Sequence, residues 1–181
     1  MEYWDSLMKH FIKYFLVITF FIFSSELLAE EKIVVLDLNY VLNQSKAGKG
    51  AQDFLKKSYT QNTKKFKDIE GALKKEETDL LSKKTVLSKE DYSKKSDSLR
   101  KKVIDYKSQR RTAMDKITTQ RAESRATLIK SITPILETYI KENNISVVIN
   151  KVHTLGGKPE NDITKIIVEK LDKVLPSLDL K

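Results

Sequence analysis

Apolar residues in the middle of the chain recur at alternating spacings of four and three, which is the pattern of a helical coiled coil. The pattern occurs twice, on either side of the stretch LSKKTVLSKED. The first series is Leu55, Tyr59, Asn62, Phe66, Ile69, Leu73, Glu76 and Leu80. The second series is Tyr92, Ser96, Leu99, Val103, Tyr106, Arg110, Ala113, Ile117, Gln120 and Ser124. Each series predicts a long helix with one narrow apolar edge, and two such edges can bury each other.

The stretch between the two series predicts that the chain turns back on itself. Ser88 and Asp91 have the spacing of a capping box, which marks the start of a second helix. We therefore expect an antiparallel hairpin over residues 45–133 with its tip near residues 82–88. At 1.5 Å per residue, each arm is on the order of 60 Å long. Polar residues interrupt both edges and Gly71 lies inside the first helix, so the arm should bend easily and project into solvent.

Two short apolar runs outside the hairpin predict buried strands. They are IVVL at residues 33–36 and ISVVIN at residues 145–150, both rich in β-branched side chains. Asp37 or Asn39 is expected to cap a short helix after the first run. A catalytic role for Asp37 is disfavoured, because no partner acid, histidine or glycine-rich loop accompanies it.

The C-terminal region predicts a turn followed by an amphipathic helix. KVHTLGGKPEND, residues 151–162, contains a Gly-Gly turn and is expected to supply part of a third strand. DITKIIVEKLDKVL reads as a helix capped by Asp162 or Thr164 and ended by Pro176. Pro134 is expected to interrupt the returning helix of the hairpin and to separate arm from body.

The predicted body consists of residues 30–44 and 134–181, and its structured part is small. A core of about 40 residues is rarely stable alone without a metal or disulfides, and the chain has no cysteine. We therefore expect strands from several chains to form a shared sheet or barrel. The candidates for this contact are Ile33, Val35, Val147 and Ile149. The predicted fold class is α+β, a small β-barrel-like oligomerisation body with a long antiparallel α-helical coiled-coil hairpin arm.

The N-terminal 29 residues are typical of an export signal. Lys9 and Lys13 precede the apolar run FLVITFFIF at residues 15–23, which is too short to span a bilayer. SSELLAE follows, and cleavage is expected after Ala29. An uncleaved membrane anchor is the alternative interpretation.

Charge is concentrated in the predicted hairpin. The whole chain has a formal net charge of +9, and residues 46–142 alone hold 25 basic and 14 acidic residues, a net of +11. Such a segment attracts phosphates, lipid head groups and acidic polypeptides. No P-loop or cysteine nucleophile is present, and His153 lacks a second ligand at a suitable spacing. We expect no enzyme activity, no cofactor and no metal site.

Four stretches resemble the Skp/OmpH family of periplasmic chaperones. They are IVVLDLNYVLNQSKAGKGAQ (33–52), the basic coiled arms, PILETYIKENNISVVIN (134–150) and NDITKIIVEKL (161–171). The resemblance covers essentially the whole chain after the signal segment, and its ends are its most specific part. It implies a homotrimer whose helical arms enclose a cavity for unfolded outer-membrane β-barrel proteins in the periplasm.

The residues favour an ATP-independent holdase that binds clients through a basic cavity between its arms. A basic surface with scattered apolar groups offers many weak contacts to an unfolded chain. The candidate client contacts are Lys101, Lys102, Lys107, Arg110, Arg111, Arg121 and Arg125. Each of them is about equally well explained as a solvated outer-face charge. Apolar residues such as Phe66, Ile69, Val103 and Tyr106 are assigned to the coil core rather than to clients.

The alternative is a coiled-coil protein that binds nucleic acid or an anionic membrane surface without specificity. A segment of charge +11 binds DNA through its phosphates, although few aromatics are available for base stacking. Because an export signal directs the protein away from DNA, such binding is expected only as an in-vitro property. Attraction to anionic lipid is compatible with the chaperone hypothesis.

Overall fold

The computed structural model describes residue 13 and residues 31–180. The predicted signal segment and its cleavage after Ala29 lie outside the described residues, apart from Lys13. Backbone contacts divide the chain into residues 1–32 and residues 33–181, and the elements described here belong to the second unit except for the first residue of β1. Within the described residues, no helix is both long enough and apolar enough to cross a membrane.

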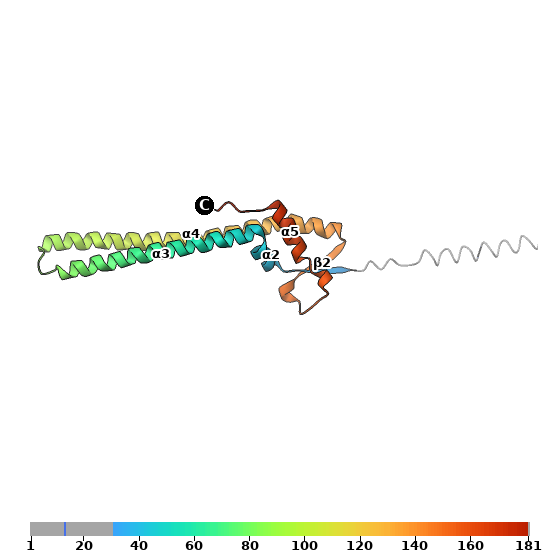
Figure 1. Cartoon of the computed structure of the whole chain (residues 1–181), viewed down its shortest axis with the longest axis horizontal. Coiled ribbons are helices and arrows are strands. Elements are labelled where there is room, and N and C mark those ends of the chain that lie inside the picture. The colour runs from blue at the N-terminus through green and yellow to red at the C-terminus, as the bar shows by residue number, and fades with distance from the viewer. Residues whose placement is uncertain (1–12, 14–30, 181) are drawn as a thin grey trace, which may run out of the picture. The chain divides into compact units, whose positions relative to one another are not determined.

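Two long helices lie side by side and form the predicted antiparallel hairpin (Figure 1). Helix α3 is Lys46–Ser82 and helix α4 is Lys89–Glu142, joined by a short turn. The predicted cap at Ser88 is confirmed, because its hydroxyl accepts a hydrogen bond from Asp91 N (3.1 Å). The same hydroxyl also contacts Asp91 Oδ2 at 2.7 Å. This cap begins α4 immediately after the turn.

The apolar edges of the two helices face each other along the hairpin. Buried positions from both predicted series are Leu55, Phe66, Leu99, Ile117, Gln120 and Ser124. The Phe66 and Tyr106 rings meet edge to face, with 6.0 Å between centroids. Tyr59 departs from the prediction, because it is 54% exposed, and Arg110, one of the polar residues that interrupt the second edge, is also exposed. Both side chains are long and end in a polar group, which can stay in water while the stem follows the helix surface.

The sequence predicts that Pro134 interrupts the returning helix, and this prediction is wrong. Helix α4 continues to Glu142 with Pro134 inside it. The last turns of α4 carry Ile135, Leu136, Tyr139 and Ile140, all packed against the body core. Burial of these side chains offsets the lost backbone hydrogen bond and the steric conflict that proline introduces, which together cost about 3 kcal/mol.

The body is built from two strands and two short helices around the end of the hairpin (Figure 1). Strands β1 (Lys32–Leu36) and β2 (Ile145–Asn150) form a two-stranded sheet. Helix α2 (Leu38–Gln44) follows β1, and Asp37 caps it by accepting from Tyr40 N at 2.8 Å, as predicted. Helix α5 is Thr164–Val174. The core contains Val34 and Leu36 from β1, Val41 from α2, Leu128 and Ile132 from α4, and Ile167 and Leu171 from α5.

The predicted third strand is absent from the described residues. Residues 151–161 instead contain two single-turn 3₁₀ helices, Lys151–His153 and Pro159–Asn161, around the Gly-Gly turn. Only one bridge joins this region to the sheet, between Val35 and Asp162. The Asn150 side chain accepts from Val152 N and starts the first of these turns, which diverts the backbone from an extended path.

The start of α5 also differs from the prediction. Its N-cap is Ile163, with no side-chain cap. Asp162 Oδ1 nevertheless accepts from Thr164 N (3.0 Å), and Thr164 Oγ1 accepts from Asp37 N (2.9 Å). The two predicted cap residues therefore connect the start of α5 to the end of β1.

Candidate binding face of the helical hairpin

Two hollows along the hairpin open on one side of the α3–α4 pair. The first lies near the turn and has a volume of about 540 Å³, and we call it the tip groove. The second lies near the body, has a volume of about 650 Å³, and is called the base pocket. On α4 the tip groove is lined by Arg100, Ile104 and Lys107, and the base pocket by Arg121 and Arg125.

These α4 residues belong to one stripe. Steps of four and three residues from Arg100 pass through Ile104, Lys107, Arg111, Met114, Thr118, Arg121 and Arg125. Residues at this spacing share one side of a helix. The stripe holds five cations and no acid. We call the side of the hairpin that carries this stripe and the two hollows the groove face.

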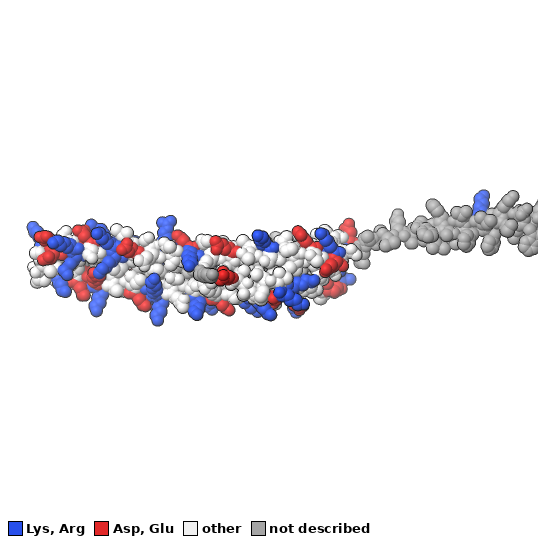
Figure 2. Space-filling model, turned by 90° about the horizontal axis from the view of Figure 1, so that it is seen from above, with Lys and Arg blue, Asp and Glu red and all other residues white. Residues whose placement is uncertain are grey.

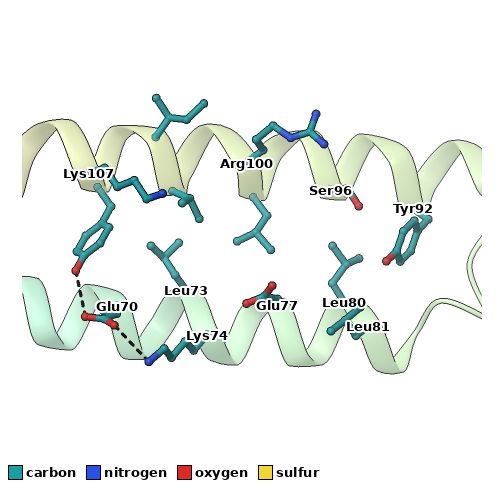
Figure 3. A pocket seen from close by; sticks show the side chains of 14 residues that line it. Glu70, Leu73, Lys74, Glu77, Leu80, Leu81, Tyr92, Ser96, Arg100 and Lys107 are labelled. Atoms are coloured by element: carbon teal, nitrogen blue, oxygen red, sulfur yellow. Dashed lines mark hydrogen bonds and ion pairs between the residues drawn. The ribbon is translucent and has the colours of Figure 1, made fainter.

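The tip groove is mainly apolar. Figure 3 shows Leu73 and Leu80 reaching from α3 into the space between the helices, with Tyr92 of α4 at the end nearest the turn. Leu81 and Ile104 also line the groove, and each is 58% exposed. Apolar side chains this open to water gain free energy when a partner covers them.

Charged groups of both signs surround the tip groove. Tyr106 donates its hydroxyl proton to Glu70 Oε2 at 3.2 Å, and Lys74 Nζ lies 3.3 Å from Glu70 Oε1 (Figure 3). The hydrogen bonds from Lys74 and then Tyr106 lower the pKa of Glu70 below its usual value. Glu77 and Arg100 also line the groove. The tip groove therefore has no strong preference for a cation or an anion.

The base pocket combines an apolar floor with a cationic rim. Leu42, Ala51, Leu55 and Leu128 line it and are buried. Three exposed cations surround them: Lys56, Arg121 and Arg125. Asp53 is the one acid among the lining residues of this pocket.

The opposite side of the hairpin is different in character. A hollow of about 510 Å³ there includes Lys75, Glu76, Asp79 and Lys95. Lys102 Nζ reaches across the hairpin to Glu76 Oε1 at 2.7 Å. In the view of Figure 2, basic and acidic side chains intermingle at the turn end of the hairpin. The opposite side therefore carries charges of both signs, and Lys102 and Glu76 pair with each other there.

The structure separates the seven predicted client contacts. Lys107, Arg121 and Arg125 line hollows on the groove face. Arg111 lies on the same stripe and is 3.7 Å from Asp115. Lys102 is bound to Glu76 on the other side, while Lys101 and Arg110 are exposed and line neither hollow.

Three cations that line these hollows were not predicted from the sequence. They are Lys74 and Arg100 at the tip groove and Lys56 at the base pocket. Extending the four-three spacing outward from the seam would have placed Arg100 with Lys107 and Arg111. Lys56 gave no comparable signal, since it depends on how the two helices come together at the body.

The predicted oligomerisation residues lie on the two strands of the body. Ile33 is 45% exposed and Val147 is 47% exposed, while Val35 and Ile149 are half-buried. The buried side of β1 carries Val34 and Leu36 instead. Alternate residues of a strand point to opposite faces, so one face of this small sheet is apolar and partly open.

A charged pair lies beside the sheet. Lys151 Nζ is 2.6 Å from Asp162 Oδ2. Burial raises the pKa of Asp162, but the hydrogen bonds from Lys151 and Thr164 outweigh it and leave this pKa below its usual value. The hydrogen bond to Asp162 raises the pKa of Lys151. Both groups therefore stay charged near neutral pH and hold the 151–162 loop against the strand.

Comparisons with known proteins agree on one family. Residues 32–171 match the family model described as outer membrane protein (OmpH-like). A Skp-like protein of Pseudomonas aeruginosa is 24% identical over 171 residues, which cover 92% of this chain and 99% of that protein. A crystal structure described as an OmpH-like outer membrane chaperone from Caulobacter crescentus matches with a TM-score of 0.76 and 16% identity, over 83% of this chain and 89% of that chain. The shared fold confirms the predicted class, helical arms with a small β body.

Proposed function

Because the chain belongs to the OmpH-like outer membrane protein family, we propose that it is an ATP-independent holdase chaperone of the periplasm. Its clients are unfolded outer-membrane β-barrel proteins, which it binds along its arms and keeps from aggregating. The relatives described above support a chaperone role in general. The observation that carries the finer proposal is the groove face, where open apolar hollows lie along a stripe of α4 that holds five cations and no acid.

This combination suits a protein that must hold an unfolded chain without trapping it. Exposed Leu81 and Ile104 offer apolar contact, and each contact alone is weak. The positive field of the hairpin accelerates encounter with acidic segments and acts over about 8 Å at physiological salt. Many weak contacts leave a client able to dissociate.

Assembly and location complete the proposal. The open apolar face of the β1–β2 sheet, with Ile33 and Val147, would be covered by other copies of the chain in a homotrimer. The arms of three copies would then enclose the client. Residues 1–29 would direct export to the periplasm and be removed.

The decisive experiment is an aggregation assay. The protein is recovered from the periplasm after expression of the full chain, and its N-terminus is sequenced. A urea-unfolded outer-membrane β-barrel protein is diluted into buffer at physiological salt, and light scattering is followed with and without the protein and without ATP. We expect scattering to be suppressed at about one trimer per client, because the proposal has the arms of one trimer enclose one client. Undiminished scattering at several-fold excess would contradict the proposal.

The same cationic stripe also supports binding to nucleic acid or anionic lipid. Such binding would weaken steeply with added salt, because it depends on release of counterions from phosphates. Protein that fails the aggregation assay but binds DNA or acidic vesicles in this salt-dependent way would favour that second function.

A further inference from the structure

We propose that the base pocket is a subsite for a carboxylate-bearing segment of an unfolded polypeptide, with an apolar side chain of that segment on the pocket floor. This inference rests on the proposed function and makes it more specific. It assigns a different ligand chemistry to each of the two hollows on the groove face.

The floor of the base pocket accepts an apolar group. Leu55 and Leu128 come from facing helices, and Leu42 comes from α2, so three elements converge there. These side chains are already packed in the protein core and form a firm surface. A volume of about 650 Å³ is enough for more than one large side chain. Tyr59 adds an aromatic side chain that is 54% exposed.

The rim of the pocket selects a negative charge. Among the residues that the structure describes, Lys56, Arg121 and Arg125 form no ion pair with an acid. Arg121 and Arg125 are four residues apart on one side of α4 and can approach the same ligand. A guanidinium binds a carboxylate through two parallel hydrogen bonds, which adds direction to the charge attraction. Three cations and one acid leave the rim positive.

Two amide side chains favour a polypeptide over a lipid as the occupant. Gln52 Nε2 donates to Asn43 Oδ1 at 2.7 Å, and both residues line the pocket. This bond leaves the Asn43 amide nitrogen and the Gln52 oxygen available at an exposed site. Together they offer N–H donors and a carbonyl acceptor, and a peptide group can pair with both kinds.

The tip groove provides the contrast. Glu70 and Glu77 line it on α3, opposite Arg100 and Lys107 of α4. Because its rim holds both signs, it has no reason to prefer an acidic segment. We therefore assign apolar segments with flanking charges of either sign to the tip groove. Apolar segments that also carry a carboxylate are assigned to the base pocket.

The test uses two fluorescein-labelled peptides of equal length that alternate phenylalanine with either aspartate or lysine. Binding to the full protein is measured by fluorescence anisotropy at physiological salt. The test variant is R121Q/R125Q, and the matched control is K101Q/R110Q, which removes the same charge from exposed α4 positions that line neither hollow. Thermal unfolding followed by circular dichroism is used to check that both variants keep the wild-type midpoint.

We expect R121Q/R125Q to weaken binding of the aspartate peptide about tenfold, which is the loss for one charged, hydrogen-bonded contact. K101Q/R110Q should weaken binding of the same peptide less than about twofold. The lysine peptide should bind wild type more weakly than the aspartate peptide, through the tip groove alone, and should respond to neither variant. Equal losses in both variants would overturn the inference in favour of a diffuse field. Binding to vesicles of acidic phospholipid is measured for the same proteins. If R121Q/R125Q loses vesicle binding but binds the aspartate peptide as wild type does, the inference is overturned in favour of a lipid site.

Failure of this inference is distinguishable from failure of the proposed function. If R121Q/R125Q binds the aspartate peptide as wild type does, while wild type suppresses client aggregation, only the subsite is wrong. If wild type binds the peptide through Arg121 and Arg125 but does not suppress aggregation, the subsite stands and the holdase function is wrong.

Discussion

Ser45 lies where the chain passes from α2 to α3, and it is fully buried. Its hydroxyl caps α3 by accepting from Gly48 N at 3.2 Å. Lys46 N, at the same helix start, donates to Asp172 Oδ1 of α5 at 2.7 Å. A carboxylate at a helix N-terminus is favoured by the unpaired N–H groups there. The first bond fixes the start of the arm, and the second connects it to α5 of the body.

Gly48 permits this junction. A Cβ atom added at Gly48 would lie 1.9 Å from the backbone oxygen of Leu42, a distance that no side-chain adjustment relieves. We expect Gly48→Ala to destabilise the protein by about 3 kcal/mol, because α2 and α3 must move apart around a packed core. Urea unfolding followed by circular dichroism measures this loss.

Gly71 is the matched control, since a Cβ added there meets no atom within 4 Å. Gly71→Ala should stabilise the helix by up to about 1 kcal/mol through helix propensity. Equal and small effects of the two substitutions would show that the α2–α3 junction tolerates a side chain.

The sequence pattern predicted the long helices well and the short connections poorly. The four-three spacing of α3 and α4 repeats over many turns, so the pairing was predictable even where Asn62 or Gln120 interrupts it. The loop at residues 151–161 follows single side chains instead, such as the Asn150 cap, and carries no period. The strand predicted there was wrong for that reason, and local turn geometry prevailed over β propensity.

Pro134 shows why a local rule failed at the other end of α4. The rule that proline ends a helix compares it with an unpacked chain, whereas the next turns of α4 are fixed by Ile135, Leu136, Tyr139 and Ile140 on the core. The set of residues that lines the base pocket was equally beyond a local rule. Lys56 and Arg121 approach the same pocket only because two helices and α2 converge there.

The cost of Pro134 is measurable. Pro134→Ala restores a backbone donor inside α4 at an exposed position. We expect stability to rise by about 2 kcal/mol, which is the roughly 3 kcal/mol interior cost of proline less up to about 1 kcal/mol for the freer unfolded chain. Thermal and urea unfolding measure the gain.

Glu137→Ala, an exposed change one turn later, is the control and should alter stability by less than about 0.5 kcal/mol. A destabilising Pro134→Ala would mean that the ring itself supports a contact of the native state, for instance with another copy of the chain.

For the whole molecule, the body is stabilised by burying its open surface, whereas the hairpin must keep its surface open to bind a client as proposed. The body has a small core and an apolar sheet face that is partly open, so association is the physical way to stabilise it. The hairpin keeps open hollows that a client can enter, so close packing of its groove face by a neighbouring copy would abolish its proposed use. Self-association is therefore expected through the body and not through the arms.

This expectation is tested by placing a charge on the body sheet. Val147→Asp puts a carboxylate on the exposed side of β2, where a partner strand face would bury it without a counter-charge. Sedimentation velocity should show a trimer for wild type and mainly monomer for the variant, with a lower thermal midpoint at low protein concentration. Val86→Asp, at a 78% exposed position in the hairpin turn, is the control and should remain trimeric. Dissociation by Val86→Asp with Val147→Asp still assembled would place the interface on the arms, and the groove face would then be an assembly surface in place of a client site.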